Sequence, residues 1–456
     1  MRARGHAVRA CPIPGLTREA RSGMATSDRQ DSKLRAALRT PTAVAGLAAL
    51  LSLAIFAVLR HFQTFSMVDM LVYRAEGAAV AAHQDLYGMR LPGWDLPATY
   101  PPFAAMLFVP STWFDVTSLR IIVTFFNIGL LGLLAWLSFK LVGWPRRQHR
   151  LPGALLAAGF GPWLEPVFTT IQYGQVNLAI ACLVLIDLTR PDRSRSKGIA
   201  IGIAAGMKLT PGLFAVYFLL TGRIRAAMVS AASFAATFLI GAVALPSASY
   251  GFWAKYLWDS SRVGLTELVD NQSLRGATAR LLSQHDPGLL ATAACGLALV
   301  GGMGVAVFAG RSARMMRRAD AWGAVCTALT ALLVSPISWT HHWVWCVPLL
   351  ILLAAEADRE WSRPKGERGR SWRVLLTVTL LSFLSYTMWL VPQSAGLGIP
   401  WNWQAASSVY PILGALVIAV VGRKVLTARR TEAERTTPAA LESAERGFYD
   451  DTLTTR

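Results

Sequence analysis

The sequence predicts an all-α fold, a polytopic transmembrane helical bundle. The chain has 456 residues, of which 54% are hydrophobic and only 16% are charged, whereas soluble globular proteins carry about 25% charged residues. The hydrophobic residues gather into runs that approach the length of a spanning helix, which needs about 20 apolar residues. Arginine and lysine clusters between the runs give a net charge of +19. These observations exclude a soluble multidomain enzyme, a disordered chain and a coiled coil.

Apolar runs divide the chain into candidate spans, and ambiguity near two of them gives about 11–13 spans in all. A lysine is costly in lipid and proline removes a backbone donor, so the run 198–220 is predicted to be two half-helices broken near Lys208. Residues 70–83 are predicted to form a short helix on the outer membrane surface, and 102–114 to be re-entrant or to lie along that surface. The candidate spans are residues 42–60, 117–143, 152–171, 175–189, 198–220, 226–245, 288–310, 320–337, 343–356, 373–391 and 407–422.

Basic clusters predict the orientation, because cytoplasmic loops of membrane proteins carry an excess of Lys and Arg. The clusters lie at 1–41, 146–150, 190–197, 223–225, 311–318, 359–373 and 423–424. Alternation then places residues 61–101, 172–174, 246–287, 338–342 and 392–406 outside. We therefore expect a multi-pass plasma-membrane protein with both termini cytoplasmic, and no nucleic-acid partner.

Three regions follow from this pattern. Residues 1–41 are expected to be a basic, disordered cytoplasmic arm, and 428–456 a polar, disordered cytoplasmic tail. The transmembrane domain spans 42–427.

The first predicted outer loop contains an aspartate directly after the first span. Asp69 stands at the start of the predicted surface helix, where it either caps the helix or acts as a catalytic base at the membrane boundary. Tyr73 follows on the same helix. Tyr100 lies in a rigid turn that is either a stiff re-entry or one wall of a lipid or sugar cleft.

Polar residues within later apolar runs are the next candidates. Glu165 lies inside a span, where carboxylates are costly and are either functional or bonded to a neighbouring helix. Gln175 and Asn177 can hold sugar hydroxyls or cap a helix. Lys208 either pairs with Glu165 or Asp69, or meets a lipid phosphate.

The large outer loop carries two arginines that are rare for that face. Arg275 and Arg280 are either solvated loop charges or ligands of a phosphate, which arginine grips with two parallel bonds. Asn271 and Gln272 precede them.

Two adjacent histidines follow Trp339. His341 and His342 would point about 100° apart on a helix, which suits one metal poorly. Imidazole beside tryptophan suits a phosphate and a sugar face, and the alternative is an interfacial aromatic belt.

Several chemistries lack their motifs. The sequence has no DxD, HExxH, GxxxxGK[ST], GxSxG or helix-opening GxGxxG, and its five cysteines form no CxxC. We therefore expect no metal, no cofactor and no disulfide framework. Chemistry on the outer face would then need an activated donor delivered by a lipid.

Six segments in this order resemble a known family. They are Asp69 with Val72-Tyr73, Thr99-Tyr100-Pro101-Pro102-Phe103, Glu165-Pro166-Val167 with Gly174-Gln175-Val176-Asn177, Lys208-Leu209-Thr210-Pro211, Asn271-Gln272-Ser273-Leu274 and Ser335-Pro336 with His341-His342. Over about 42–425 the chain is similar to actinobacterial polyprenol-phosphate-mannose-dependent α-1,2-mannosyltransferases, which are integral membrane glycosyltransferases of the GT-C type.

The resemblance implies a polyprenyl-phosphate-mannose donor, a mannosylated glycolipid or lipoglycan acceptor, surrounding membrane lipids and an outward-facing, inverting active site. It also implies a catalytic base in the first outer loop, which matches Asp69. Val68 and Met70 flank that residue, so no metal-binding acidic pair is expected. Donor-phosphate contacts are expected from Lys208, Arg275, Arg280, His341 and His342. Sugar positioning is expected from Tyr73, Tyr100, Glu165, Gln175, Asn177, Asn271, Gln272 and Trp339.

Two classes of alternative remain. A related GT-C transferase with another polyprenyl-phosphate sugar, such as arabinofuranose, fits the same motifs. A lipid or polysaccharide transporter, or a non-catalytic envelope subunit, is the alternative outside the enzymes. Transporters often show inverted repeats and midplane charges, whereas this sequence shows no repeat and gathers its polar residues at one face.

Overall fold

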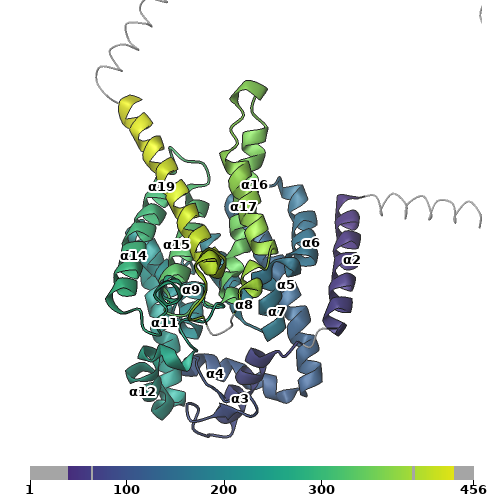
Figure 1. The fold of residues 1–456 in the computed structure, drawn as a ribbon, viewed down its shortest axis with the longest axis vertical. Coiled ribbons are helices and arrows are strands. Elements are labelled where there is room, and N and C mark those ends of the chain that lie inside the picture. Colours follow the sequence, from purple (N-terminus) through teal and green to yellow (C-terminus); the bar gives the residue numbers. More distant parts are fainter. Residues whose placement is uncertain (1–39, 63–64, 393–395, 436–456) are drawn as a thin grey trace, which may run out of the picture.

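The protein is a bundle of helices with one short β-hairpin (Figure 1), in a computed structural model that describes residues 40–62, 65–392 and 396–435. The first part comprises α2 (Pro41–Phe62), α3 (Val68–Ala81), β1 (Arg90–Leu91), β2 (Leu96–Pro97), α4 (Pro102–Phe108), α5 (Val116–Val142), α6 (Arg150–Phe160), α7 (Glu165–Tyr173), α8 (Asn177–Leu188), α9 (Ile199–Met207) and α10 (Gly212–Leu220). The second comprises α11 (Ile224–Ala244), α12 (Pro246–Ala254), α13 (Leu274–Leu282), α14 (Gly288–Arg311), α15 (Ala319–Val334), α16 (Cys346–Trp361), α17 (Ser371–Leu384), α18 (Gln404–Ser407) and α19 (Val409–Arg435). Short 3₁₀ turns η1 (Val109–Trp113), η3 (Gly161–Trp163), η6 (Thr340–Trp345) and η8 (Thr387–Leu390) connect some of them. The predicted all-α class is confirmed.

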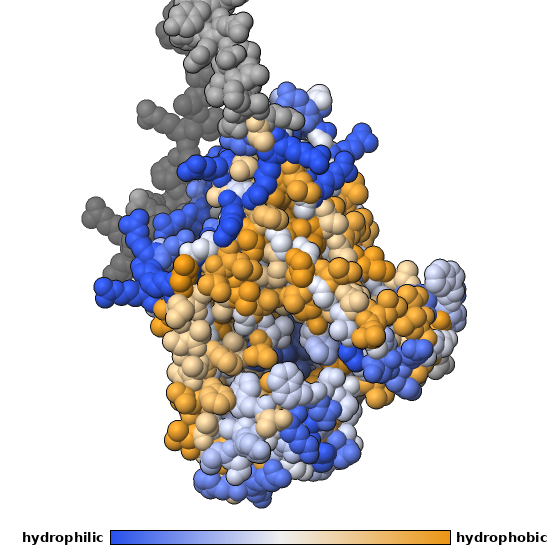
Figure 2. All heavy atoms as spheres, turned by 90° about the vertical axis from the view of Figure 1, so that its left-hand side faces the viewer, coloured by the Kyte–Doolittle hydropathy of each residue, from blue (hydrophilic) through white to orange (hydrophobic). Residues whose placement is uncertain are grey.

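Long apolar helices make this a multi-pass membrane protein. Within the described residues, six helices are long and apolar enough to cross a bilayer: α2, α5, α11, α14, η6 with α16, and α19. The pair α7 and α8 passes the same test together but is bent by 119°. Apolar side chains on these helices face outward and form a belt (Figure 2). The other predicted spans are shorter or interrupted helices.

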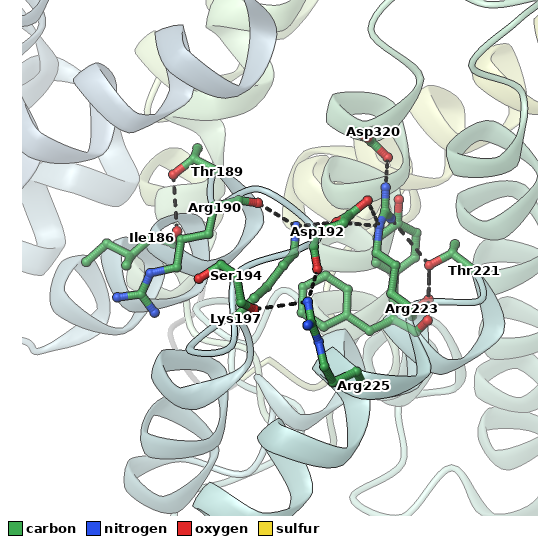
Figure 3. Close-up of polar contacts among 12 residues, drawn as sticks. Ile186, Thr189, Arg190, Asp192, Ser194, Lys197, Thr221, Arg223, Arg225 and Asp320 are labelled. Carbon is green, nitrogen blue, oxygen red and sulfur yellow. Dashed lines mark hydrogen bonds and ion pairs between the residues drawn. The ribbon is translucent and has the colours of Figure 1, made fainter.

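The run 198–220 is a helical hairpin, as predicted. The loop before α9 and the loop after α10 meet at Asp192, whose carboxylate lies 2.8 Å from Lys197 Nζ and 3.2 Å from Arg223 Nε (Figure 3). Arg223 also pairs with Asp320 at the start of α15. Both ends of the hairpin therefore lie together, and the half-buried Lys208 stands at the break between its two helices.

One predicted span is wrong. The run 152–171 is divided, because α6 ends at Phe160, the Gly161-Pro162 turn follows, and α7 begins at Glu165. Helix α19 continues to Arg435, so it extends into the first residues of the predicted tail 428–456. The remainder of the tail and nearly all of the arm 1–41 lie outside the described residues.

The predicted surface helix 70–83 is α3, which lies with α4 and α12 at the end of the bundle opposite the C-terminal end of α19 (Figure 1). It packs closely against the α4–η1 segment that was predicted over 102–114. A Cβ added to Gly77 of α3 would lie 2.6 Å from the Phe108 carbonyl oxygen. This close approach fixes α3, and so Asp69, against its neighbours.

Candidate active site

Asp69 lies in the first turn of α3 without capping it. The N-cap is Met67, with φ at 47°, and no side chain caps the helix. The capping interpretation of Asp69 is therefore wrong. Its half-buried carboxylate accepts a 2.6 Å hydrogen bond at Oδ2 from Nε2 of Gln175.

Gln175 follows the sharp turn between α7 and α8, which Gly174 makes with a φ of +70°. A side chain at that position would collide with Met70 of α3, 2.7 Å away. The turn therefore brings the amide of Gln175 against α3. Its Oε1 accepts 2.7 Å from the Tyr73 hydroxyl, which lies 3.0 Å from that of Tyr100.

Lys208 enters the same network from the tip of the α9–α10 hairpin. Its Nζ lies 2.9 Å from Nε2 of His342 and 3.3 Å from Oδ1 of Asn177. The amide nitrogen of Asn177 in turn lies 3.3 Å from Oε1 of Gln175. A continuous chain of contacts thus runs from the carboxylate of Asp69 to the Lys208–His342 pair.

A cavity that opens to solvent adjoins the Lys208 end of this chain. Lys208, His342 and Asn177 form its polar part, and α10, α15 and η6 supply apolar walls that include a stacked Phe214–Trp345 pair with ring centroids 5.2 Å apart. One cation beside an apolar wall suits a ligand with an anionic group and a hydrocarbon chain. Figure 2 shows the surface hollowed below the apolar belt, with hydrophilic atoms at its depth.

Two carboxyl groups on α3, those of Asp69 and Glu76, have raised pKa values because burial disfavours their charged forms. Burial raises the pKa of Asp69 to about 6, against the opposing effects of the Gln175 hydrogen bond and the Lys208 charge. Burial raises the pKa of Glu76 to about 8, although the backbone amides of Thr99 and Tyr100 oppose this. Asp69 is therefore poised to take a proton near neutral pH.

Glu165 lies away from this chain of contacts, at the start of α7. Its fully buried carboxylate accepts 2.6 Å from the Tyr410 hydroxyl and 3.2 Å from Nε1 of Trp389. These bonds join α7 to α19 and η8, which matches the interpretation of Glu165 as a bond to neighbouring helices.

His341 lies beside the network with free ring nitrogens. It is 5% exposed, and neither ring nitrogen has a hydrogen-bond partner within the described residues. Its ring meets those of Tyr173 and His342 edge to face, with centroids 5.4 Å and 4.8 Å apart.

The structure gives the two predicted phosphate-binding arginines other partners. Arg275 pairs with the exposed Asp286 at 2.8 Å. Arg280 is fully buried and donates to the carbonyl oxygens of Leu268 and Asn271, at 2.8 and 2.9 Å. Neither lies in the chain of contacts around Lys208.

The remaining predicted sugar-positioning residues, Asn271, Gln272 and Trp339, make contacts between separate segments of the chain. Asn271 donates to the carbonyl of Pro336 and pairs with Trp339 in an isolated β-bridge. Gln272 donates to the carbonyl of Ser407 and accepts from the amide of Tyr410. These contacts tie the large loop to η6 and α19.

Sequence reasoning gave no role to Glu76 or Ser338. Glu76 is fully buried and accepts a 3.0 Å bond from the amide of Thr99. The Ser338 hydroxyl lines the cavity without a partner among the described residues.

Within the part of the chain that the structure describes, no group of three or more His, Cys, Asp or Glu is placed to hold a metal ion.

Comparison with known proteins decides the family. The profile of glycosyltransferase family 87 matches residues 98–336. A polyprenol-phosphate-mannose-dependent α-(1-2)-phosphatidylinositol mannoside mannosyltransferase of Mycobacterium tuberculosis (strain H37Rv) is 32% identical over 384 residues, 80% of this chain and 86% of that protein. The chain belongs to glycosyltransferase family 87. The predicted resemblance is confirmed.

Two further relatives are similar over most of both chains. The polyprenol-phosphate-mannose-dependent α-(1-2)-phosphatidylinositol pentamannoside mannosyltransferase of M. tuberculosis (strain CDC 1551) is 35% identical over 76% of this chain and 79% of that protein. A phosphatidylinositol mannoside mannosyltransferase of Mycolicibacterium smegmatis is 31% identical over 78% of this chain and 83% of that protein. The crystal structure of ArnT from Cupriavidus metallidurans bound to undecaprenyl phosphate aligns with a TM-score of 0.37, at 16% identity, over 85% of this chain and 79% of that chain.

Proposed function

We propose that this family 87 protein transfers mannose from polyprenyl-phosphate-mannose to a mannosyl glycolipid or lipoglycan, forming α-1,2 linkages with inversion. The relatives carry this donor and linkage in their names, and they match most of both chains. The observation that carries the proposal is the chain of contacts from the Asp69 carboxylate to Lys208. This network joins a carboxylate, which can serve as a base, to a lysine ammonium group, and so supports the proposal.

We propose the outer face of the plasma membrane for the reaction. The basic loop residues Arg190, Lys197 and Arg223 lie near one another (Figure 3), and strongly hydrophilic side chains cover the end of the molecule opposite α3 (Figures 1 and 2). Since such loops remain on the cytoplasmic side, α3 and Asp69 face outward and both ends of the chain lie in the cytoplasm. The catalytic unit is the transmembrane domain, residues 42–427.

In this mechanism Asp69 is the general base. Its Oδ2 is held by Gln175, and within the described residues Oδ1 accepts no hydrogen bond. Oδ1 takes the proton of an acceptor mannose hydroxyl as that oxygen bonds to the anomeric carbon of the donor. The bond from that carbon to the phosphate oxygen breaks on the opposite face, which inverts the configuration.

The leaving phosphate takes the bonding electron pair and gains negative charge. Lys208 lies in the cavity wall with His342, where an ammonium group stabilises the departing phosphate monoester, a dianion, more than the singly charged phosphodiester of the donor. The apolar wall made by Phe214 and Trp345 accommodates the hydrocarbon of the lipid carrier. Asn177 and Gln175 connect the two ends and hold them at a fixed separation.

Transfer by the purified full-length protein tests the proposal. The protein is incubated with radiolabelled polyprenyl-phosphate-mannose and a phosphatidylinositol mannoside, and the product linkage is determined. We expect an α-1,2-mannosyl product with the wild type and none with Asp69→Asn, which should fold normally. Two outcomes would contradict the proposal. One is transfer from polyprenyl-phosphate arabinofuranose but not from polyprenyl-phosphate-mannose, and the other is undiminished transfer by Asp69→Asn.

A further inference from the structure

We propose that Tyr173 and Asp270 form a subsite that holds the acceptor sugar beside the catalytic carboxylate. This inference rests on the proposed function and adds the residues that select the neutral sugar substrate. Neither side chain belongs to the network that links Asp69 to Lys208.

Tyr173 offers an aromatic surface at the end of α7. Its side chain is half-buried, and within the described residues its hydroxyl makes no hydrogen bond. The ring rests on apolar residues that include Val68 and Val72 of α3, and its edge meets His341 at 5.4 Å and 80°. Gln175, which holds Asp69, is two residues away. Tyr173 is thus fixed beside the first turn of α3, which carries Asp69.

Asp270 is presented by a rigid loop. The residue after it, Asn271, accepts at Oδ1 from the amide of Ser338 at 2.9 Å, and its carbonyl accepts from the fully buried Arg280. The amide of Gln272 donates 2.7 Å to the Ser338 carbonyl. The Asp270 residue itself is exposed, and its carboxylate has no hydrogen-bond partner among the described residues. The buried polar residues of this loop therefore place at a defined position a carboxylate on which the charge of Arg280 acts.

Three segments bring these groups together. The β-bridge between Asn271 and Trp339 places the Asp270 loop against the start of η6, and the ring contact places Tyr173 against His341 of η6. The carboxylates of Asp270, Asp69 and Glu165 all act electrostatically on the Tyr173 hydroxyl, with Asp270 acting most strongly. The buried imidazole of His341 lies beside the Tyr173 ring, and neither of its nitrogens has a hydrogen-bond partner among the described residues.

This combination suits a neutral sugar and disfavours a phosphate. The C–H face of a pyranose packs on an aromatic ring, whose face carries partial negative charge. Sugar hydroxyls donate to a carboxylate, which has only acceptors. Two carboxylates repel a phosphate, which is held instead at Lys208. The subsite therefore belongs to the acceptor, and its hydroxyl reaches Asp69.

The test separates acceptor binding from donor binding in the purified full-length protein. Initial rates are measured with octyl α-D-mannopyranoside as acceptor and polyprenyl-phosphate-mannose as donor, each varied against a saturating partner. The variants are Asp270→Asn and Tyr173→Leu. Their matched controls are Asp286→Asn, an exposed carboxylate near the same loop, and Tyr250→Leu, at a 79% exposed tyrosine of α12.

We expect Asp270→Asn and Tyr173→Leu to raise the acceptor KM at least tenfold and to leave the donor KM within twofold. Both controls should stay within threefold of the wild type for each substrate. An unchanged acceptor KM, an equal rise in both KM values, or failure of Asp270→Asn to fold would overturn the inference. Absence of transfer by the wild type would instead overturn the proposed function, so the two failures are distinguishable.

Discussion

The side-chain amide nitrogen of Gln175 lies 2.6 Å from Oδ2 of Asp69, although the two residues are 106 positions apart in the chain. The contact exists because Gly174 turns the chain sharply between α7 and α8 and directs Gln175 at α3. An amide hydrogen bond stabilises the charged carboxylate and so lowers its pKa, while burial raises it. The balance leaves the pKa of Asp69 at about 6.

That balance predicts the pH dependence of transfer. A general base must be deprotonated, so kcat/KM should rise about tenfold per pH unit below a midpoint near 6 and level off above it. Gln175→Leu removes the amide bond, which should move the midpoint to higher pH. The measurement is a pH–rate profile of the wild type and of Gln175→Leu, and Gln148→Leu serves as the control variant. A profile whose midpoint is the same in Gln175→Leu and wild type would contradict this role for the amide.

Glu76 predicts a pH dependence of stability. Burial holds its pKa near 8 in the folded protein, against an ordinary value of 4.5. The folded state then binds a proton that the unfolded state has lost, so stability falls as pH rises from about 4.5 to about 8. Glu76→Gln keeps an acceptor for the Thr99 amide and cannot ionise.

We therefore expect the Tm of Glu76→Gln to exceed that of the wild type by more at pH 8 than at pH 5. Thermal unfolding of the purified protein in one detergent at both pH values measures this difference. All other titrating groups are shared, so the comparison isolates Glu76. Parallel changes in the two proteins would show that Glu76 is charged in the fold.

Charge and hydropathy predicted much of the fold because they act locally. The hairpin around Lys208 followed from basic residues at both ends of one apolar run, and the structure joins those ends through Asp192. The break inside 152–171 was missed, because Gly161-Pro162 lies within a run that is apolar throughout. Hydropathy measures how much apolar surface a run offers, and it does not register a turn made of apolar residues.

The candidate site was predicted unevenly for a related reason. Asp69, Gln175, Asn177, Lys208 and His342 were predicted residues, and the structure joins them in one network. Arg280 was expected at a phosphate, but it is enclosed by carbonyl oxygens of its own loop. A guanidinium group can bind either a phosphate or carbonyl oxygens, and only the tertiary contacts decide which of the two it binds.

The close approach of α3 to the end of α4 predicts a steric effect at Gly77. A Cβ there would lie 2.6 Å from the Phe108 carbonyl oxygen, which belongs to the backbone and cannot rotate away. Gly77→Ala should cost about 1–3 kcal/mol of stability and reduce transfer, because α3 carries Asp69. Gly129→Ala in α5, which meets no atom within 4 Å, is the matched control. Equal thermal unfolding of the two variants would contradict the close packing.

The buried carboxylate of Glu165 predicts an effect of its hydrogen-bond donor. Tyr410→Phe removes the 2.6 Å bond from the hydroxyl and leaves a buried acceptor short of a partner, which costs about 1–3 kcal/mol. Thermal unfolding should show a lower Tm than the wild type. Tyr250→Phe, at a 79% exposed tyrosine, should leave Tm unchanged. A Tm loss shared by both variants would point away from Glu165.

Lys208 predicts the largest effect on the chemical step after Asp69. Its ammonium group lies 2.9 Å from His342 in the cavity wall, and it is the cation closest to the proposed departing phosphate. An interaction that strengthens as charge develops acts on kcat more than on KM. Lys208→Met should therefore lower kcat about 10²–10³-fold while the donor KM rises much less.

Two further variants serve as controls. Lys208→Arg should recover part of the loss because it retains the charge. Lys255→Met, at an exposed lysine, should transfer mannose at the wild-type rate. A Lys208→Met variant that raised the donor KM without lowering kcat would show that the lysine binds the ground-state phosphate and gives no added stabilisation to the leaving group.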